Sequence, residues 1–259
     1  MTGAGPMTGS RQGRVWGLIA EQAASDGGQV TAADACTAAV ATLAVSGAWL
    51  SAASGKELTG HLMWVTDAVG ERLAELQLTL GEGPGPDAAA YGGPVLVSDL
   101  DETDAGRRWP VFAQAARRAG AAAIFAFPLR IGAIRAGVMG LYRERAGPLS
   151  VEQLGDALIF ADAATLLLIS ADQADQEGMT ASGGAPGGQP ADLAGHRAEI
   201  DQATGMLTEQ LGVGIAEAFV RLRAYAYVHD RPLADLARDI VARRLRLGPD
   251  PDLTVDGRA

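Results

Sequence analysis

The chain has 259 residues, of which 48% are hydrophobic, and its formal net charge is −10. This length and apolar share suffice for one domain of medium size plus a small one. A single cysteine excludes an intrachain disulfide and a cysteine-cluster metal site, and the acidic average disfavours binding to nucleic acid or anionic membranes.

The average hides an uneven distribution of charge. Residues 195–247 hold eight arginines and seven acidic residues, a net charge of +1, so the rest of the chain carries −11. The C-terminal part is thus nearly neutral, and most of its arginines lie toward its C-terminal end. The acidic total therefore does not describe the C-terminal part of the chain.

The two ends of the chain are polar or rich in small residues. Residues 1–12 lack the apolar run of a signal peptide, and we expect them to be disordered, like residues 248–259. No stretch reaches about 18 uninterrupted apolar residues, the length that spans a membrane. The sequence therefore predicts a cytoplasmic protein without a membrane segment.

Residues 13–172 alternate between helix and strand signals. Thr31 is a possible helix cap, and so is Asp67. Helices are expected over 14–24, 31–45, 67–76, 107–120 and 148–170, and strands over 47–53, 61–66, 92–100 and on both sides of a turn at 131–133. Five strands between flanking helices predict an α/β sensor-type domain, an antiparallel sheet flanked by helices.

This order resembles the GAF family. The resemblance extends over 13–172 and includes "LTLGEGPGPDAAAYGGPVLVSDL" and "RWPVFAQAARRAGAAAIFAFPLRIGAIRAGVMGLYR". It implies a domain that binds a small ligand in a pocket over the sheet, or one that serves as a dimerisation module. Gly85 stands where the family often has cysteine, so a thiol sensor at that position is excluded.

Residues 173–194 form the expected linker, rich in Gly, Pro, Ala and Ser and without apolar periodicity. Three helices are expected after it. Their apolar stripes are Ile200, Ala203, Leu207 and Leu211; Ile215, Phe219, Leu222 and Ala226; and Leu233, Leu236, Ala237, Ile240 and Val241.

Local signals define the ends of these three helices. Gly212 is expected to stop the first, Gly214 to cap the second, and Pro232 to occupy the first position of the third. Gly205 lies inside the first helix, where glycine costs about 1 kcal/mol relative to alanine. We expect it to mark a close helix–helix contact.

Arginines and tyrosines remain outside these stripes. Guanidinium groups suit phosphates and aromatic faces suit unstacked bases, which is the chemistry of single-stranded RNA recognition. The candidate RNA-contact residues are Arg197, Arg221, Arg223, Tyr225, Arg231 and Arg238.

Residues 195–247 resemble the ANTAR domain, a three-helix RNA-binding module of bacterial antiterminators. The matching positions are Arg197, Ile200, Gln202, Ala203, Gly205, Leu207, Gly212, Glu217, Ala218, Phe219, Leu222, Arg223, Ala226, Leu233, Ala237 and Ile240. The sequence departs from the family at Thr204, where Lys is usual, at Gln210, where Arg is frequent, and at Gly214, where a capping Ser is common. The absence of these two positive charges weakens electrostatic binding to RNA phosphates.

Other signals favour structural roles. "GEGPGPD" (81–87) lacks the Gly-Lys-Ser/Thr ending of a phosphate-binding loop and indicates a turn leading into a helix at Asp87. Cys36 shares a helical face with apolar residues, which indicates core packing. His61, His196 and His229 are scattered, so no metal site is expected, and the four acidic residues within 99–104 indicate a solvated loop.

We therefore expect a regulator in which a GAF-like sensor controls an ANTAR-like domain that binds stem-loops in nascent RNA and promotes transcription antitermination. The expected partners are RNA, a second copy in a homodimer, and a small molecule or protein at the GAF-like domain. No catalytic residue and no cofactor are expected. Two alternatives remain: an interaction or dimerisation module that no longer binds RNA, and a methionine sulfoxide reductase, whose chemistry needs several reactive cysteines.

Overall fold

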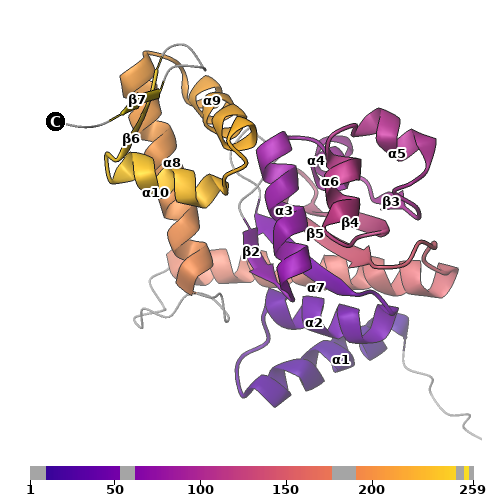
Figure 1. Cartoon of the computed structure of the whole chain (residues 1–259). Helices are drawn as coiled ribbons and strands as arrows, with labels where there is room; N and C mark the ends of the chain where they lie inside the picture. Colours follow the sequence, from indigo (N-terminus) through magenta and orange to yellow (C-terminus); the bar gives the residue numbers. More distant parts are fainter. Residues whose placement is uncertain (1–9, 53–61, 177–190, 249–253, 257–259) are drawn as a thin grey trace, which may run out of the picture.

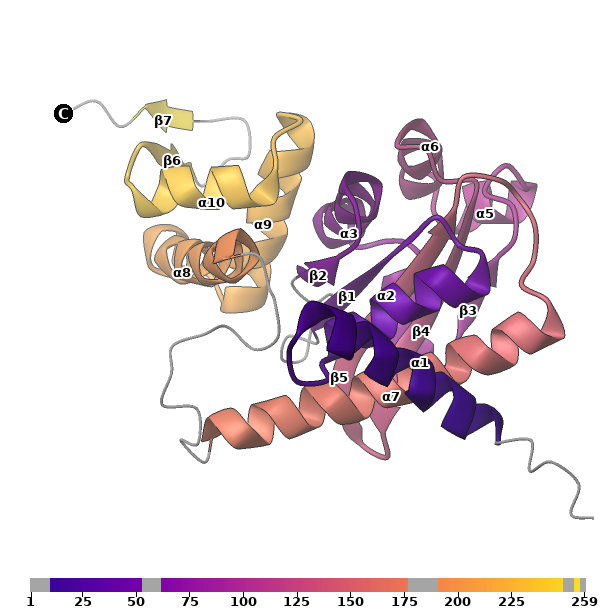
Figure 2. The same cartoon turned by 90° about the horizontal axis from the view of Figure 1, so that it is seen from below.

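The computed structural model describes residues 10–52, 62–176, 191–248 and 254–256 (Figure 1). They form an α/β body, residues 11–176, and a C-terminal unit that begins at residue 191. The two lie side by side in both views (Figures 1 and 2). The fold class expected from the sequence is confirmed: a five-stranded antiparallel sheet flanked by helices, followed by three helices.

The sheet has the order β2-β1-β5-β4-β3 and every pair in it is antiparallel. Its strands are β1 (Gly47–Ala52), β2 (Leu62–Val65), β3 (Val95–Val97), β4 (Ala123–Ile131) and β5 (Ile134–Arg143). The hairpin of β4 and β5 forms the centre, because β1 pairs with β5 and β3 pairs with β4.

One face of the sheet is covered by α1 (Arg11–Asp26), α2 (Ala32–Leu43) and α7 (Val151–Gln176) (Figure 2). Thr31 caps α2 in a capping box with Asp34, as expected for Thr31. Arg14 Nη2 donates to both carboxylate oxygens of Asp156, at 2.7 and 2.8 Å, and so connects α1 to α7. The core on this face includes Ile19, Phe125 and Phe160, each at most 1% exposed.

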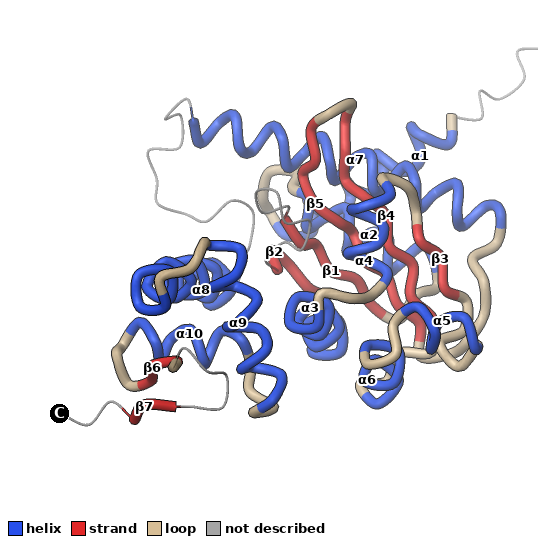
Figure 3. Tube along the Cα trace, turned by 90° about the horizontal axis from the view of Figure 1, so that it is seen from above, coloured by secondary structure: helices blue, strands red, loops and turns tan. Residues whose placement is uncertain are grey.

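The other face is covered by α3 (Ala68–Leu80), α4 (Pro84–Tyr91), α5 (Thr103–Arg108) and α6 (Phe112–Arg118) (Figure 3). Asp67 caps α3 by accepting from the backbone N–H groups of residues 69 and 70. Trp49, Trp109 and Phe112 fill the space beneath these helices and are at most 2% exposed. Gly140 is needed here, since a Cβ at this position would collide with the Trp49 ring.

The segment 81–120 differs in detail from the expected elements. Helix α4 begins at Pro84, after the Gly83 N-cap, and not at Asp87. The acidic loop expected over 99–104 contains the start of α5, and the single helix expected over 107–120 is interrupted at Pro110, which cannot donate a helical hydrogen bond. Glu82 Oε1 accepts from the N–H groups of Val111 and Phe112 and stabilises the start of α6.

The C-terminal unit contains α8 (Ala191–Leu211), α9 (Ile215–Val228) and α10 (Leu233–Val241), followed by the hairpin of β6 (Leu245–Leu247) and β7 (Thr254–Asp256). The expected apolar stripes are buried or half-buried, with one exception: Ile215 is 67% exposed. Gly214 caps α9 as expected, whereas Pro232 is the N-cap of α10 and not its first helical residue.

The expectation for Gly205 is wrong. This residue is exposed, and a Cβ added to it would meet no atom within 4 Å outside its own helix backbone. The close approach of the helices is made instead by Ala203, Ala218, Ala226 and Ala237, each at most 1% exposed.

Several elements cross the expected domain boundaries. Helix α1 begins at Arg11, with Ser10 as its N-cap, inside the segment expected to be disordered. Helix α7 continues to Gln176, past the expected domain end at 172, and α8 starts at Ala191, inside the expected linker. Strand β7 lies within the expected disordered tail. Most of the expected linker, residues 177–190, lies outside the described residues.

Residues 151–171 of α7 are long and apolar enough to cross a membrane by length and composition alone, with a mean hydropathy of 1.7. Their small and aromatic side chains pack against α2 and the sheet: Ala157, Phe160, Ala161, Ala163 and Ala164 are at most 4% exposed. We therefore describe α7 as a core helix of the body.

Candidate nucleic-acid interface

Two of the candidate arginines belong to α9. Arg221 forms an ion pair with Glu217 one turn earlier, at 2.6 Å, and its side chain is 35% exposed. Arg223 points to the body: its Nε donates to the carbonyl oxygen of Thr79 in α3, at 2.9 Å, and its guanidinium lies 5.7 Å from the centre of the Phe219 ring. The two arginines thus have different surroundings.

The aromatic residues of α9 also differ. Tyr225 is half-buried, and its ring centre lies 4.0 Å from that of His229. Tyr227 is 54% exposed. Tyr227 is therefore the more accessible stacking surface, although Tyr225 was the residue chosen from the sequence.

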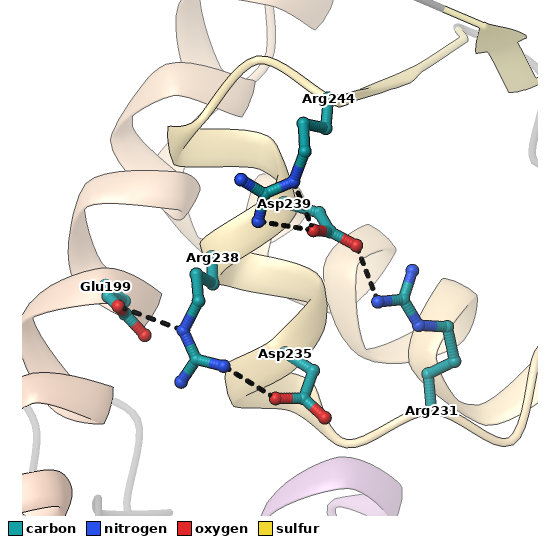
Figure 4. A network of polar contacts seen from close by, with 6 residues as sticks. All are labelled: Glu199, Arg231, Asp235, Arg238, Asp239 and Arg244. Atoms are coloured by element: carbon teal, nitrogen blue, oxygen red, sulfur yellow. Dashed lines mark hydrogen bonds and ion pairs between the residues drawn. The ribbon is translucent and has the colours of Figure 1, made fainter.

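Arg231 and Arg238 take part in a polar network along α10 (Figure 4). Asp239 accepts from Arg231 at 2.6 Å and from Arg244 at 2.9 Å. Arg238 lies between Glu199 of α8, at 3.3 Å, and Asp235, at 2.9 Å. The network consists of three arginines and three carboxylates, so its formal net charge is zero.

The network perturbs the titration of its members. Hydrogen bonds from Arg231 and then Arg244 lower the pKa of Asp239. The hydrogen bond to Glu199, together with the charge of Glu199, raises the pKa of Arg238. Within the described residues, the second Glu199 oxygen, Oε2, is buried without a hydrogen-bond partner. A phosphate that contacts Arg231 or Arg238 must therefore compete with carboxylates that already hold them.

Other basic residues of the unit are placed differently. Arg197 lies in α8, and its side chain falls outside the described residues. Arg243 and Arg246 are exposed, and neither has an ion-pair partner within the described parts of the chain. They follow α10 and supply positive charge beside the network.

Two grooves border the contact between the body and the C-terminal unit. One, of about 260 Å³, lies between α3 and the helices α8 and α10 and has a mainly apolar lining that includes Leu78, Ile200 and Leu233. The other, of about 440 Å³, lies between α3, α6 and the end of α9, and is lined partly by Tyr227 and Arg231.

The remaining candidate chemistry lies in the body. Cys36 is completely buried, and burial raises the pKa of its thiol, which leaves the group unreactive. The described residues contain no group of three or more His, Cys, Asp or Glu placed to hold a metal ion. His61 lies outside the described residues.

A family model for the ANTAR domain matches residues 194–241, which include nearly all of the three helices α8, α9 and α10. Residues 194–241 form an ANTAR domain. None of the curated proteins compared with the chain is significantly similar to it.

Solved structures are similar to the body. The GAF domain of the Acinetobacter phosphoenolpyruvate-protein phosphotransferase is 11% identical, with a TM-score of 0.49 over 66% of this chain and 99% of that one. The GAF-B domain of DevS from Mycobacterium smegmatis is 20% identical, with a TM-score of 0.41 over 55% and 93%. Free methionine-R-sulfoxide reductase from Neisseria meningitidis is 12% identical, with a TM-score of 0.40 over 67% and 99%.

Two of the three departures from the family pattern, Thr204 and Gln210, lie in different environments. Thr204 is 5% exposed, and its hydroxyl donates to the Ile200 carbonyl within α8 at 2.7 Å. Gln210 is exposed and donates through its side-chain amide to the carbonyl of Leu247. Both side chains here serve the internal structure of the domain.

Proposed function

We propose that this chain is a cytoplasmic regulator whose GAF-like body controls RNA binding by its ANTAR domain, and that RNA binding promotes transcription antitermination. The observation that carries the proposal is the match of residues 194–241 to the ANTAR model, together with a packed three-helix unit at those residues. Binding to a stem-loop in nascent RNA would disfavour a terminator hairpin, so transcription would continue.

The RNA-contact surface that we propose consists of the arginines and tyrosines on α9 and around α10. Arg221, Arg223, Tyr225, Arg231 and Arg238 remain our candidates, with Arg197 in support. Tyr227, Arg243 and Arg246 join them because they are exposed. Contacts of this kind supply phosphate charge neutralisation and base stacking.

The body, in this proposal, receives the input. Its partner is a small molecule or a protein, and a second copy of the chain forms a homodimer. The space between the sheet and α3 to α6 is filled by Trp49, Trp109 and Phe112. We therefore assign the two grooves at the junction with the ANTAR domain as the places where an input could act on both units.

The proposal needs no catalysis. Reduction of methionine sulfoxide, an activity found among proteins with this fold, would need several reactive thiols, and the chain has one cysteine, fully buried. Methionine-sulfoxide reductase activity that is lost in Cys36→Ser would contradict this part of the proposal.

Cross-linking in the native cells, followed by purification and sequencing of the attached RNA, tests the proposal directly. We expect enrichment of transcript leaders with stem-loops near terminators. Recovery of no RNA above background from a folded, well-expressed protein would contradict RNA binding.

A second candidate function is supported by the zero net charge of the α10 network and by the structural roles of Thr204 and Gln210. In that case the ANTAR domain acts as a protein-interaction or dimerisation module. Capture of a protein partner that resists nuclease treatment, with no RNA recovered, would favour it.

A further inference from the structure

Helix α3 has two apolar faces that belong to different units. Leu73 and Leu76 pack in the core of the body, beneath α3. Leu78, which is 9% exposed, belongs instead to the apolar cluster of the ANTAR domain, together with Leu207, Phe219 and Leu222. The body thus contributes one large side chain to the core of the other unit, and α3 lies beside α9 (Figure 2).

The polar contact next to Leu78 joins Arg223 to the end of α3. Helix α3 ends at Leu80, and Gly81 is its C-cap with φ 67°. The Thr79 carbonyl belongs to the last turn, where carbonyl oxygens lack helical partners and the helix dipole is negative. Arg223 Nε donates to this oxygen at 2.9 Å, and its guanidinium lies so close to Gly81 that a Cβ there would collide with it.

A weaker contact also joins α3 to the end of α9. Arg72 of α3 lies 3.9 Å from Asp230, which follows α9, and the two side chains are 46% and 97% exposed. An exposed pair of this kind contributes little stability. The burial of Leu78 and the hydrogen bond of Arg223 are therefore stronger contacts between α3 and α9 than this exposed ion pair.

These contacts place a candidate RNA-contact residue against the body. While Arg223 caps α3, its Nε–H is committed to the Thr79 carbonyl and its Nη2 lies against Gly81, which leaves fewer of its N–H donors for an RNA phosphate. RNA that approaches this side of α9 therefore meets helix α3 of the body.

We propose that α3 is an autoinhibitory element: in the docked arrangement it occupies the Arg223 side of α9, and the ANTAR domain binds RNA only after α3 is released. This inference rests on the proposed RNA binding. It identifies the equilibrium between the docked and the released α3–α9 contact as the one that an input to the body shifts. About ten docked molecules for each released one would weaken the apparent affinity for RNA about tenfold.

The first experiment compares the full-length wild type with Leu78→Asp, which removes the apolar anchor but leaves every candidate RNA-contact residue in place. The matched control is Leu96→Asp, on the sheet edge strand β3, where Leu96 is 45% exposed. The probe is the RNA pool recovered by cross-linking. We expect Leu78→Asp to bind it at least about tenfold more tightly and to give a larger radius of gyration in X-ray scattering, with Leu96→Asp like the wild type.

The second experiment does not require the fold to tolerate an aspartate at residue 78. Cys36 is fully buried, so a thiol reagent applied to Leu78→Cys reports the exposure of residue 78, with the unmodified chain as background. Because binding and release are linked, saturating RNA must speed the labelling of Leu78→Cys. Leu96→Cys serves as the control that RNA leaves unchanged.

The outcomes separate the two proposals. If the wild type and Leu78→Asp bind RNA with equal affinity, autoinhibition is overturned and RNA binding stands. The same conclusion follows if RNA leaves the labelling rate of Leu78→Cys unchanged. An unchanged radius of gyration in a folded Leu78→Asp would also overturn it, because Leu78 would not hold the contact. Failure of the wild type and Leu78→Asp alike to bind RNA would overturn the proposed function itself.

Discussion

Gly205 lies on the exposed side of α8, and an added methyl group would meet no atom within 4 Å. Glycine inside a helix costs about 0.5–1 kcal/mol relative to alanine, because it loses more backbone freedom on folding. We therefore expect Gly205→Ala to raise the free energy of unfolding of the ANTAR domain by about that amount, measured by thermal or urea unfolding of the full chain.

Gly140→Ala is the matched comparison, since the same added methyl would collide with the Trp49 ring in the core of the body. We expect that variant to be destabilised. A loss of stability in Gly205→Ala would instead support the prediction from the sequence that Gly205 lies in a close helix–helix contact.

Asp239 is the acidic centre of the α10 network. Its folded pKa is lowered by hydrogen bonds from Arg231 and Arg244, so its contribution to stability is present above the unfolded pKa, about 3.9, and is lost as the pH falls through the folded pKa. We expect Asp239→Asn to be less stable than the wild type at pH 7, and the difference to shrink as the pH is lowered below about 4.

Unfolding curves of both proteins between pH 7 and pH 3 measure this effect. Glu209→Gln, at an exposed carboxylate of α8, controls for the general loss of a negative charge from the domain. A difference between Asp239→Asn and the wild type that stays constant down to pH 3 would show that the ion pairs of Asp239 do not stabilise the fold.

At the scale of the elements, α9 and α10 each present one arginine whose role in RNA binding is separable from the α3 contact. Arg221 is held by Glu217, and Arg238 by Glu199 and Asp235. If these arginines contact phosphates, each substitution by alanine weakens RNA binding and reduces the slope of log affinity against log salt by about 1.

Affinity of Arg221→Ala and of Arg238→Ala for the cross-linked RNA, measured over a series of salt concentrations, tests this expectation. Arg145→Ala removes the same charge from an exposed site of the body and controls for net charge. A salt slope that is equal in all three variants and the wild type would exclude Arg221 and Arg238 as phosphate contacts.

Helical periodicity predicted most of the ANTAR core, because residues at helical spacing such as Ile200, Leu207 and Leu236 face the same side whatever the neighbours are. It failed at Ile215, since angular position specifies a face but not how far a neighbouring helix extends. It also could not find the partners of the arginines: Arg223 meets Thr79, which is 144 residues away in the chain.

At the scale of the whole molecule, the sequence divided the chain into a body and a tail but did not indicate their contact. Leu78 is one of several leucines with helical spacing in α3, and nothing local distinguishes it from Leu73, which packs in the body. Such a residue is recognisable only after both units have been placed. The control of RNA binding that we propose therefore depends on tertiary structure, whereas the resemblance of the C-terminal helices to the ANTAR family was evident from the sequence.

The proposed homodimer also belongs to this scale, and α7 offers a surface for it. Along this helix Val151, Leu158 and Leu166 are 86%, 41% and 46% exposed, and their spacing places them within one stripe on the side away from the core. Burial of this stripe between two copies would remove apolar area from water. The double variant Leu158→Arg, Leu166→Arg should therefore shift the mass in solution from dimer to monomer.

Light scattering coupled to size-exclusion chromatography measures that mass, and Leu96→Arg, on the edge strand β3, supplies the control for an added arginine at an exposed leucine. A dimer that persists in the double variant would place the interface on another surface. A wild type that is monomeric throughout the concentration range would contradict the homodimer itself. The α3–α9 contact would then be regulated within single chains, since it is formed by residues of one copy.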